Sequence, residues 1–357
     1  MDNLIIFGFI CNANAGGRNF MRQVGRKRIF VIGMILFILG TIVASLSNSF
    51  TYLVLARSVQ GTGAAAVFPA VTSMIRETFA DKSGKVMSLL SASASAGVLL
   101  GPPLSGYLLE ISDYRCLFII TLPLAVINFF TALLFFPNKP AKPLLKPTAL
   151  KDIKSRPFYK DETYIAVIVM VLCQNFIVYG LGIIIPLQLI MDFHLSTSQT
   201  GSFVMGFPLA LLLTSPLGGY LTDKKGYWIP VISGSAILLI TLVLLSLKMV
   251  STTITFIMAL FIVMGVGFGL TISPLTLGSM ENASEKDLAK ASGFFGLARQ
   301  LGGAAGAAIT PLIESNNVAY RYLAFIQLMG LIIFIVLNRI NKLNIVTYNK
   351  MKKVDTK

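Results

Sequence analysis

The chain has 357 residues, of which 55% are hydrophobic and only 13% charged, and its formal net charge is +15. Soluble domains average about 25% charged residues. This composition, together with a mean hydropathy of +0.77, excludes an ordinary soluble protein and predicts a chain that crosses a membrane several times.

Ten apolar segments follow one another along the chain. Each is close to the roughly 20 residues that a helix needs to cross a bilayer, and none shows the short alternating pattern of a β-barrel strand. We therefore predict an all-α polytopic membrane protein. The segments are residues 29–47, 52–75, 86–109, 115–136, 164–190, 198–221, 228–247, 253–278, 288–312 and 319–338.

The basic residues are concentrated in alternate loops. If the loop that holds "RQVGRKR" is cytoplasmic and the chain changes sides at each span, 25 Lys and Arg residues lie inside and three outside, while Arg57 and Arg299 fall within spans. This distribution follows the positive-inside rule. It predicts a multi-pass protein of the cell membrane with both termini in the cytoplasm, and it attributes the positive charge to topology and not to nucleic-acid binding.

The sequence does not indicate a metal or nucleotide site. Cys11, Cys116 and Cys173 are isolated, His194 is the single histidine, and no GxxxxGK[ST] phosphate loop occurs. We expect no cofactor and no enzymatic activity, so any uphill work would draw on an ion gradient or on a partner.

The chain contains an internal repeat. The segments "VGRKR" and "DKKGYW" each follow a loop and precede a span, and their glycines, Gly25 and Gly226, are 201 residues apart. The halves keep this offset to their ends, which is typical of transporters built from repeats. The predicted parts are residues 1–24 as a non-matching N-terminal segment, 25–136 as an N-terminal half of four helices, 137–162 as a cytoplasmic linker rich in Pro and Lys, 163–340 as a C-terminal half of six helices, and 341–357 as a basic cytoplasmic tail.

The two halves differ at their beginnings. Two whole spans lie between Tyr164 and Gly226, whereas only 24 residues precede Gly25, and their apolar run is too short to cross a bilayer. We therefore expect about ten helices of a twelve-helix plan to be present, with the first two missing.

The cytoplasmic loops carry a first family resemblance. The segment "GGYLTDKKG" resembles the G-x-L-x-D-R/K-x-G-R/K-R/K loop of the major facilitator superfamily, and a tight loop needs glycine where φ is positive. The resemblance implies that these loops gate transport, although Arg22 stands at the aspartate position of the first copy; an ordinary basic loop is the alternative. The matching residues are Gly219, Asp223, Lys224 and Gly226 in the second copy and Gly25, Arg26 and Lys27 in the first.

The segment "LVLARSVQGTGAAA" resembles the fourth-helix pattern of the drug:proton antiporters in that superfamily. Arg57 and Gln60 lie three residues apart and so share one helix face. A charge within the membrane is costly, which makes an arginine there a functional candidate by default. The resemblance implies a part in proton coupling for Arg57, and a snorkelling arginine is the alternative.

The segment "GVLLGPPLSG" resembles the antiporter motif of the fifth helix through Gly97, Gly101, Pro102 and Gly106. Gly97 and Gly101 are four residues apart, so they leave one side of the helix bare for a close neighbour, and the prolines bend the helix. The resemblance implies export, with this segment as a hinge; a packing face without a transport role is the alternative.

Polar residues of the second half complete the candidate set. Arg299 is the other cation within a span, and one apolar span holds several amides and a phenol that could face a substrate cavity or bond between helices. The sequence leaves both interpretations open for Gln174, Asn175, Tyr179 and Gln188.

The resemblance implies the major facilitator fold, with two pseudo-symmetric helical halves in the lipid bilayer, and proton-coupled efflux of drug-like or amphipathic small molecules by alternating access. We expect a monomer whose partners are its substrate and protons. The alternatives are an exporter of a metabolite such as a sugar or an organic acid, and a transport-inactive truncated remnant. The remnant is considered because the carboxylates of the spans, Glu110, Asp192 and Glu314, lie near their ends.

Overall fold

The structure is a computed structural model that describes residues 26–78, 83–135, 159, 161–247, 253–281, 288–313 and 315–354. Within these residues each of the ten predicted segments is helical and no strand occurs, so the all-α prediction is confirmed. The helices are α2 (Arg26–Ser45), α3 (Phe50–Thr78), α4 (Ser83–Ile111), α5 (Arg115–Phe135), α6 (Glu162–Met191), α7 (Thr197–Val204), α8 (Gly206–Lys225), α9 (Trp228–Leu245), α10 (Ile254–Gly278), α11 (Leu288–Ile309), the short 3₁₀ helix η3 (Thr310–Leu312) and α12 (Asn316–Val354).

Seven candidate membrane spans in the described chain meet both length and hydropathy requirements. They are α2, α5, α6, α7 together with α8, α9, α10 and α12. The helices α3, α4 and α11 fall outside this set, and they are the helices that carry the arginine and glycine motifs of the sequence.

Two helix boundaries differ from the prediction. The segment at 198–221 forms two helices, α7 and α8, with a break at Met205, and α12 continues through Val354, beyond the predicted end at residue 338. No proline or glycine follows residue 338 in this helix, so nothing in the local sequence stops it. Hydropathy therefore locates the membrane-spanning part of α12 but not the residue at which the helix ends.

The described chain divides into two compact units. The first consists of α2–α5 together with residues 196–202 at the start of α7, and the second contains the remaining helices. Chain order alone would have placed residues 196–202 in the second unit.

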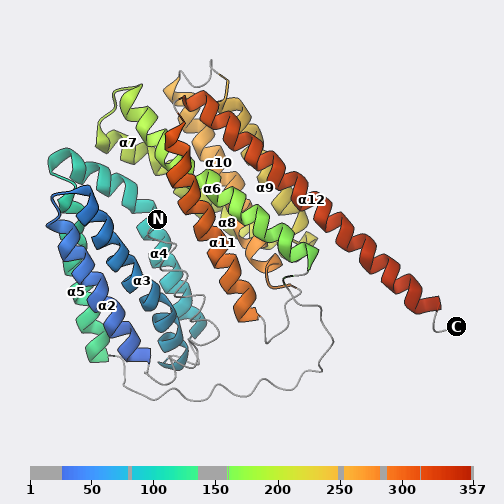
Figure 1. Cartoon of the computed structure of the whole chain (residues 1–357), viewed down its shortest axis with the longest axis horizontal. Helices are drawn as coiled ribbons and strands as arrows, with labels where there is room; N and C mark the ends of the chain where they lie inside the picture. Colours follow the sequence, from blue (N-terminus) through green and yellow to red (C-terminus); the bar gives the residue numbers. More distant parts are fainter. Residues whose placement is uncertain are drawn as a thin grey trace. The chain divides into compact units, whose positions relative to one another are not determined.

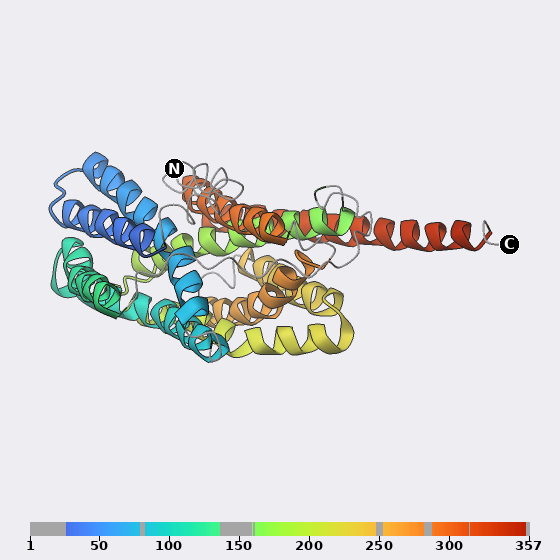
Figure 2. The ribbon, with the colours of Figure 1, turned by 90° about the horizontal axis from the view of Figure 1, so that it is seen from below.

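The first unit is built around α2, which packs against both α3 and α5 (Figure 1 and Figure 2). Its core brings Phe30 and Met34 of α2 together with Met74 of α3 and Ala132 of α5. Where α2 crosses α3, a Cβ on Gly40 would lie only 2.6 Å from the backbone nitrogen of Gln60. Glycine at that position therefore permits the close approach of the two helices.

The second unit is built around α6, which packs against α10, α11 and α12. Its buried face carries Ile177, Leu181 and Ile185, which meet Leu238 of α9 and Leu323 of α12. Lipid tails are as apolar as these side chains, so close packing and interhelical hydrogen bonds hold such helices together. Figure 1 shows the last turns of α12 extending beyond the other helices of this unit.

Candidate functional site

Arg57 and Gln60 form a hydrogen-bonded chain on one face of α3. The Arg57 guanidinium donates to Gln60 Oε1 at 2.7 Å, and Gln60 Nε2 donates to Thr41 Oγ1 of α2 at 2.9 Å. Gln60 is buried with 6% of its surface exposed, whereas Arg57 is exposed. The buried amide thus fixes the position of a charged group that is itself accessible.

This pair borders a hollow of 420 Å³ within the first unit. The hollow is lined by Arg57 and Gln60 of α3, by Gly101 and Ser105 of α4 and by Phe118 of α5, among other residues. The Arg57 guanidinium carbon lies 5.8 Å from the centroid of the Phe118 ring, within the range of a cation–π contact. Two motifs that the sequence located on separate helices therefore meet at one site.

The glycines of α4 divide into two kinds. A Cβ built on Gly97 or Gly101 would meet no heavy atom within 4 Å. At Gly106 a Cβ would collide with the backbone of Thr197 and lie 3.2 Å from the Cα of Gly201, which both belong to the first unit. The close approach that the sequence predicts at Gly97 and Gly101 is therefore found at Gly106 in the described structure.

The prolines lie inside α4, as the sequence indicates. Pro102 and Pro103 remove two backbone donors from the helix, and the Ser105 hydroxyl donates to the Pro102 carbonyl at 3.0 Å. Ser105 thus supplies a hydrogen-bonding group beside the break.

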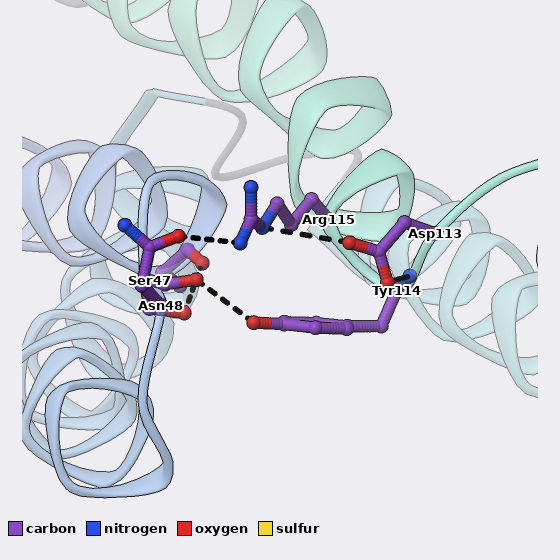
Figure 3. Close-up of polar contacts among 6 residues, drawn as sticks. Ser47, Asn48, Asp113, Tyr114 and Arg115 are labelled. Carbon is purple, nitrogen blue, oxygen red and sulfur yellow. Dashed lines mark hydrogen bonds and ion pairs between the residues drawn. The ribbon is translucent and has the colours of Figure 1, made fainter.

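The turns at one end of the first unit are joined by a polar cluster (Figure 3). The Tyr114 hydroxyl donates to the Ser47 carbonyl at 2.8 Å, and the Arg115 guanidinium donates to Asn48 Oδ1 at 2.6 Å. Arg115 Nε also lies 3.5 Å from a carboxylate oxygen of Asp113. These contacts tie the α2–α3 turn to the α4–α5 turn and hold the helices that line the hollow.

The loop between α8 and α9 has the geometry of a tight helix end. Gly226 follows α8 with φ of +76°, and its N–H donates to the Thr222 carbonyl at 2.8 Å. Such a φ favours glycine, as the sequence predicts for this loop. Asp223 and Lys224 are exposed, with the Lys224 ammonium 4.6 Å from the Tyr220 ring centroid.

The other residues of the two loop motifs have few or distant contacts, except for Lys27. Gly219 lies on α8 with its nearest neighbour, the Cβ of Ser273, 3.9 Å from where its own Cβ would be. In the first copy Gly25 lies outside the described residues, and Arg26 begins α2. Lys27 donates from Nζ to the Leu133 carbonyl of α5 at 2.8 Å.

The two glutamines of α6 bond to other helices of the second unit. Gln174 donates to Ser235 Oγ of α9 at 3.1 Å and accepts from Thr271 Oγ1 of α10 at 2.9 Å. Gln188 accepts a hydrogen bond from the Tyr320 hydroxyl of α12. Of the two interpretations that the sequence left open, a substrate cavity or bonds between helices, the observed contacts of Gln174 and Gln188 are bonds between helices.

The other two polar residues of α6 are placed differently. Asn175 is buried and lines a small cavity of 10 Å³ with Arg299 of α11, while its amide donates to the Val171 carbonyl of its own helix at 2.8 Å. Tyr179 is 49% exposed and lies against Gly303. Arg299 is exposed on the same helix as Gly303. Asn175, Tyr179 and Arg299 thus stay candidates for a ligand-facing surface of the second unit.

We expect Gln174→Leu to lower the free energy of unfolding by about 1 kcal/mol, because the hydroxyls of Ser235 and Thr271 lose an interhelical partner. Unfolding of the purified protein in mixed micelles measures the change. Gln300→Leu, at a half-buried position on α11, serves as the control and is expected to stay within about 0.5 kcal/mol. Equal stability of both variants would contradict the structural role of Gln174.

Comparison with known proteins identifies the family. The family model described as "Major Facilitator Superfamily" matches residues 16–307, which is most of the chain. The chain belongs to the major facilitator superfamily. A solved member of the same fold, a bacterial homologue of the human lysosomal transporter Spinster in an inward-facing and occupied conformation, superposes with a TM-score of 0.70 over 87% of this chain and 82% of that one, at 15% sequence identity.

Curated relatives in the superfamily are similar over most of this chain. The uncharacterized transporter YwoD of Bacillus subtilis is 23% identical, over 87% of this chain and 80% of its own length. The uncharacterized transporter YebQ of Escherichia coli is 28% identical, over 81% and 75%. The multidrug resistance protein Stp of Mycobacterium tuberculosis is 25% identical over 80% of this chain, which spans 63% of Stp. The superfamily and these relatives establish a membrane transporter of small molecules.

Two residues that contact the Arg57–Gln60 pair were not predicted from the sequence. Thr41 supports Gln60, and Phe118 lies under the Arg57 guanidinium. Both belong to helices other than α3, so no spacing within a motif could indicate them. A lone threonine in the apolar span of α2 was the one available signal, because a buried hydroxyl needs a partner.

Proposed function

We propose that this protein is a proton-coupled exporter of the drug:proton antiporter type, which moves drug-like or amphipathic small molecules across the cell membrane by alternating access. It acts as a monomer with both termini in the cytoplasm. The observation that carries the proposal is the hollow in which Arg57 of α3 and Gly101 of α4 lie together. The name of the relative Stp, a multidrug resistance protein, supports the substrate class.

Arg57 keeps its positive charge at any physiological pH, so it does not itself carry the proton. Its role in the proposal is to lower the pKa of a carboxyl group that enters the hollow, because a nearby opposite charge favours the ionised form. Gln60 holds the guanidinium in place, and Arg299 has the corresponding role in the second unit. Release of the proton leaves a carboxylate and so strengthens the ion pair with Arg57, and protonation weakens it, in step with the change of access.

The remaining candidate residues have mechanical or binding roles in this proposal. The α4 motif with Pro102 and Pro103 acts as the hinge, and the loop with Asp223 and Lys224 acts as the cytoplasmic gate. Asn175 and Tyr179 contribute to the substrate surface of the second unit. A broken helical ladder bends more readily than an intact one, which is the reason to place the hinge at the prolines.

A second candidate function follows from the exposure of Arg57. A guanidinium that opens into a hollow pairs well with a carboxylate, so an organic acid fits the site better than a neutral sugar. The structure therefore also supports export of an anionic metabolite.

Reconstitution separates these functions. The purified chain in proteoliposomes with a trapped pH-sensitive dye is expected to move protons when an amphipathic cationic dye such as ethidium is added on the substrate side. A proton flux with organic acids but not with ethidium would select the metabolite exporter. No flux with either class would select the transport-inactive remnant and overturn the proposal.

A further inference from the structure

An exposed arginine lies in the middle of α11. Arg299 stands midway between Leu288 and Ile309, the first and last residues of this helix, so each end is about 15 Å away along the axis. Its guanidinium makes no hydrogen bond or ion pair with any residue that the structure describes. A charge in the interior of a membrane helix is costly unless it is paired. The position therefore favours a bound anion.

The arginine of the first unit is held differently. Arg57 donates to Gln60 at 2.7 Å, within its own helix. The polar residue that lines a cavity with Arg299 is Asn175, and its amide donates to the Val171 carbonyl of α6 at 2.8 Å. That cavity measures 10 Å³, which is room for one water molecule at most. A larger ligand therefore meets the guanidinium on its exposed side and not between the helices.

An aromatic ring lies one helical turn away on the same side of α11. A Cβ on Gly303 would lie 2.9 Å from Cδ2 of Tyr179, so this ring of α6 rests against the backbone of α11. Tyr179 is nevertheless 49% exposed. Gly303 follows Arg299 by four residues, which places both on one side of the helix, about 6 Å apart along its axis. A flat apolar surface thus lies beside an unpaired charge.

The space along these two helices extends beyond the ring and the charge. Gly182 follows Tyr179 by three residues on α6, and Gly296 precedes Arg299 by three on α11. Residues three apart lie on one side of a helix. A Cβ built on either glycine would meet no described heavy atom within 4 Å. The second unit therefore has room here for a ligand longer than a single ring.

We propose that Tyr179 and Arg299 form a binding site for an aromatic carboxylate. The ligand ring packs on the phenol ring, and its carboxylate accepts two parallel hydrogen bonds from the guanidinium. Gly303 positions the phenol, because any side chain there would displace the ring. The proposal names the substrate class of the second unit's surface, so it rests on the proposed export of amphipathic molecules. The carboxyl group whose pKa Arg299 lowers is then the ligand's own.

Equilibrium dialysis of the full chain in lipid nanodiscs tests this site, with empty nanodiscs as the blank. The probes are 2-naphthoate, 2-naphthamide, which keeps the rings without the charge, and decahydro-2-naphthoate, which keeps the charge without aromaticity. The naphthoate is expected to bind at least tenfold more tightly than either analogue. Arg299→Gln is expected to abolish the preference over the amide, and Tyr179→Leu the preference over the saturated acid. Unchanged binding of the amide to Arg299→Gln, and of the saturated acid to Tyr179→Leu, shows that each variant is folded.

Two substitutions on α12 are the matched controls. Arg339→Gln removes another exposed arginine, and Tyr322→Leu removes a tyrosine that is 46% exposed. Both variants are expected to keep both preferences. Equal binding of the three probes, preferences that persist in Arg299→Gln and Tyr179→Leu, or preferences that are lost in the controls would each overturn the site.

Binding at equilibrium needs no transport, so the site and the proposed function can fail separately. Equal binding of the probes in a chain that still moves protons with ethidium would overturn the site and leave the exporter. Both preferences in a chain that shows no flux with any substrate would support the site and overturn the exporter.

Discussion

Replacement of Arg57 by alanine is expected to reduce substrate-driven proton flux about a hundredfold. Among the described residues that line the hollow with Gly101, Arg57 is the one that carries a charge, and the change removes it, while Gln60 stays anchored to Thr41 through its own amide. A hundredfold loss corresponds to about 2.7 kcal/mol, within reach of a single charge-assisted contact in a low-dielectric site. Dye-monitored flux in proteoliposomes measures the effect.

Two controls make the Arg57 result specific. Arg339→Ala removes an arginine of α12 that is also exposed, far along the chain from the motif, and is expected to leave the flux unchanged. Arg57→Lys keeps the charge but loses the planar geometry that reaches both Gln60 and the Phe118 ring, so partial activity is expected. Full flux in Arg57→Ala, at normal membrane insertion, would remove this residue from the coupling mechanism.

Hydropathy and spacing were sufficient to predict the helices, because each crossing must satisfy its backbone internally and must span the hydrocarbon core. The same reasoning correctly placed Gly226 in a tight loop and Arg57 with Gln60 on one face. These are local properties, which depend on residues within a few positions of one another. The break at Met205 was not predicted, although Gly206 follows it directly; the nearest proline, Pro208, lies inside α8.

Contacts between helices could not be read from the sequence. The partners of Gln174 lie on α9 and α10, and that of Gln188 lies on α12, so a polar residue in an apolar span gave no indication of whether it faces a cavity or a neighbour. The glycines of α4 show the same limit. Their spacing predicts a bare face, but only the structure shows that Gly106 is covered and Gly101 is open.

Burial affects a polar pair in the loop between α8 and α9. Burial, with a smaller contribution from the charge of Glu281, raises the pKa of Tyr227 to about 12, so the phenol stays protonated and donates to Asn338 Oδ1 at 3.1 Å. Tyr227 stands between α8 and α9, and Asn338 lies on α12. This bond joins the loop between α8 and α9 to α12, a link that neither motif nor spacing indicates.

Gly306→Leu is expected to prevent the second unit from folding, and Gly306→Ala to cost about 3 kcal/mol. A Cβ on Gly306 would lie 2.7 Å from the carbonyl carbon of Phe176 and 2.8 Å from its Cα, so relief requires α11 and α6 to move apart. The α6 helix is central to its unit, and its displacement would also disturb the bonds of Gln174. Thermal unfolding in detergent and the yield of monodisperse protein measure the loss.

Gly296→Ala on the same helix is the matched control. A Cβ there meets no heavy atom within 4 Å, and alanine has the higher helix propensity by about 1 kcal/mol, so this variant is expected to be as stable as the original chain or slightly more so. Stability changes of opposite sign in Gly306→Ala and Gly296→Ala would show that the loss comes from contact with α6 and not from a general effect of replacing glycine in α11. Equal stability of both alanine variants would show that α6 and α11 do not approach each other closely at Gly306 and Phe176.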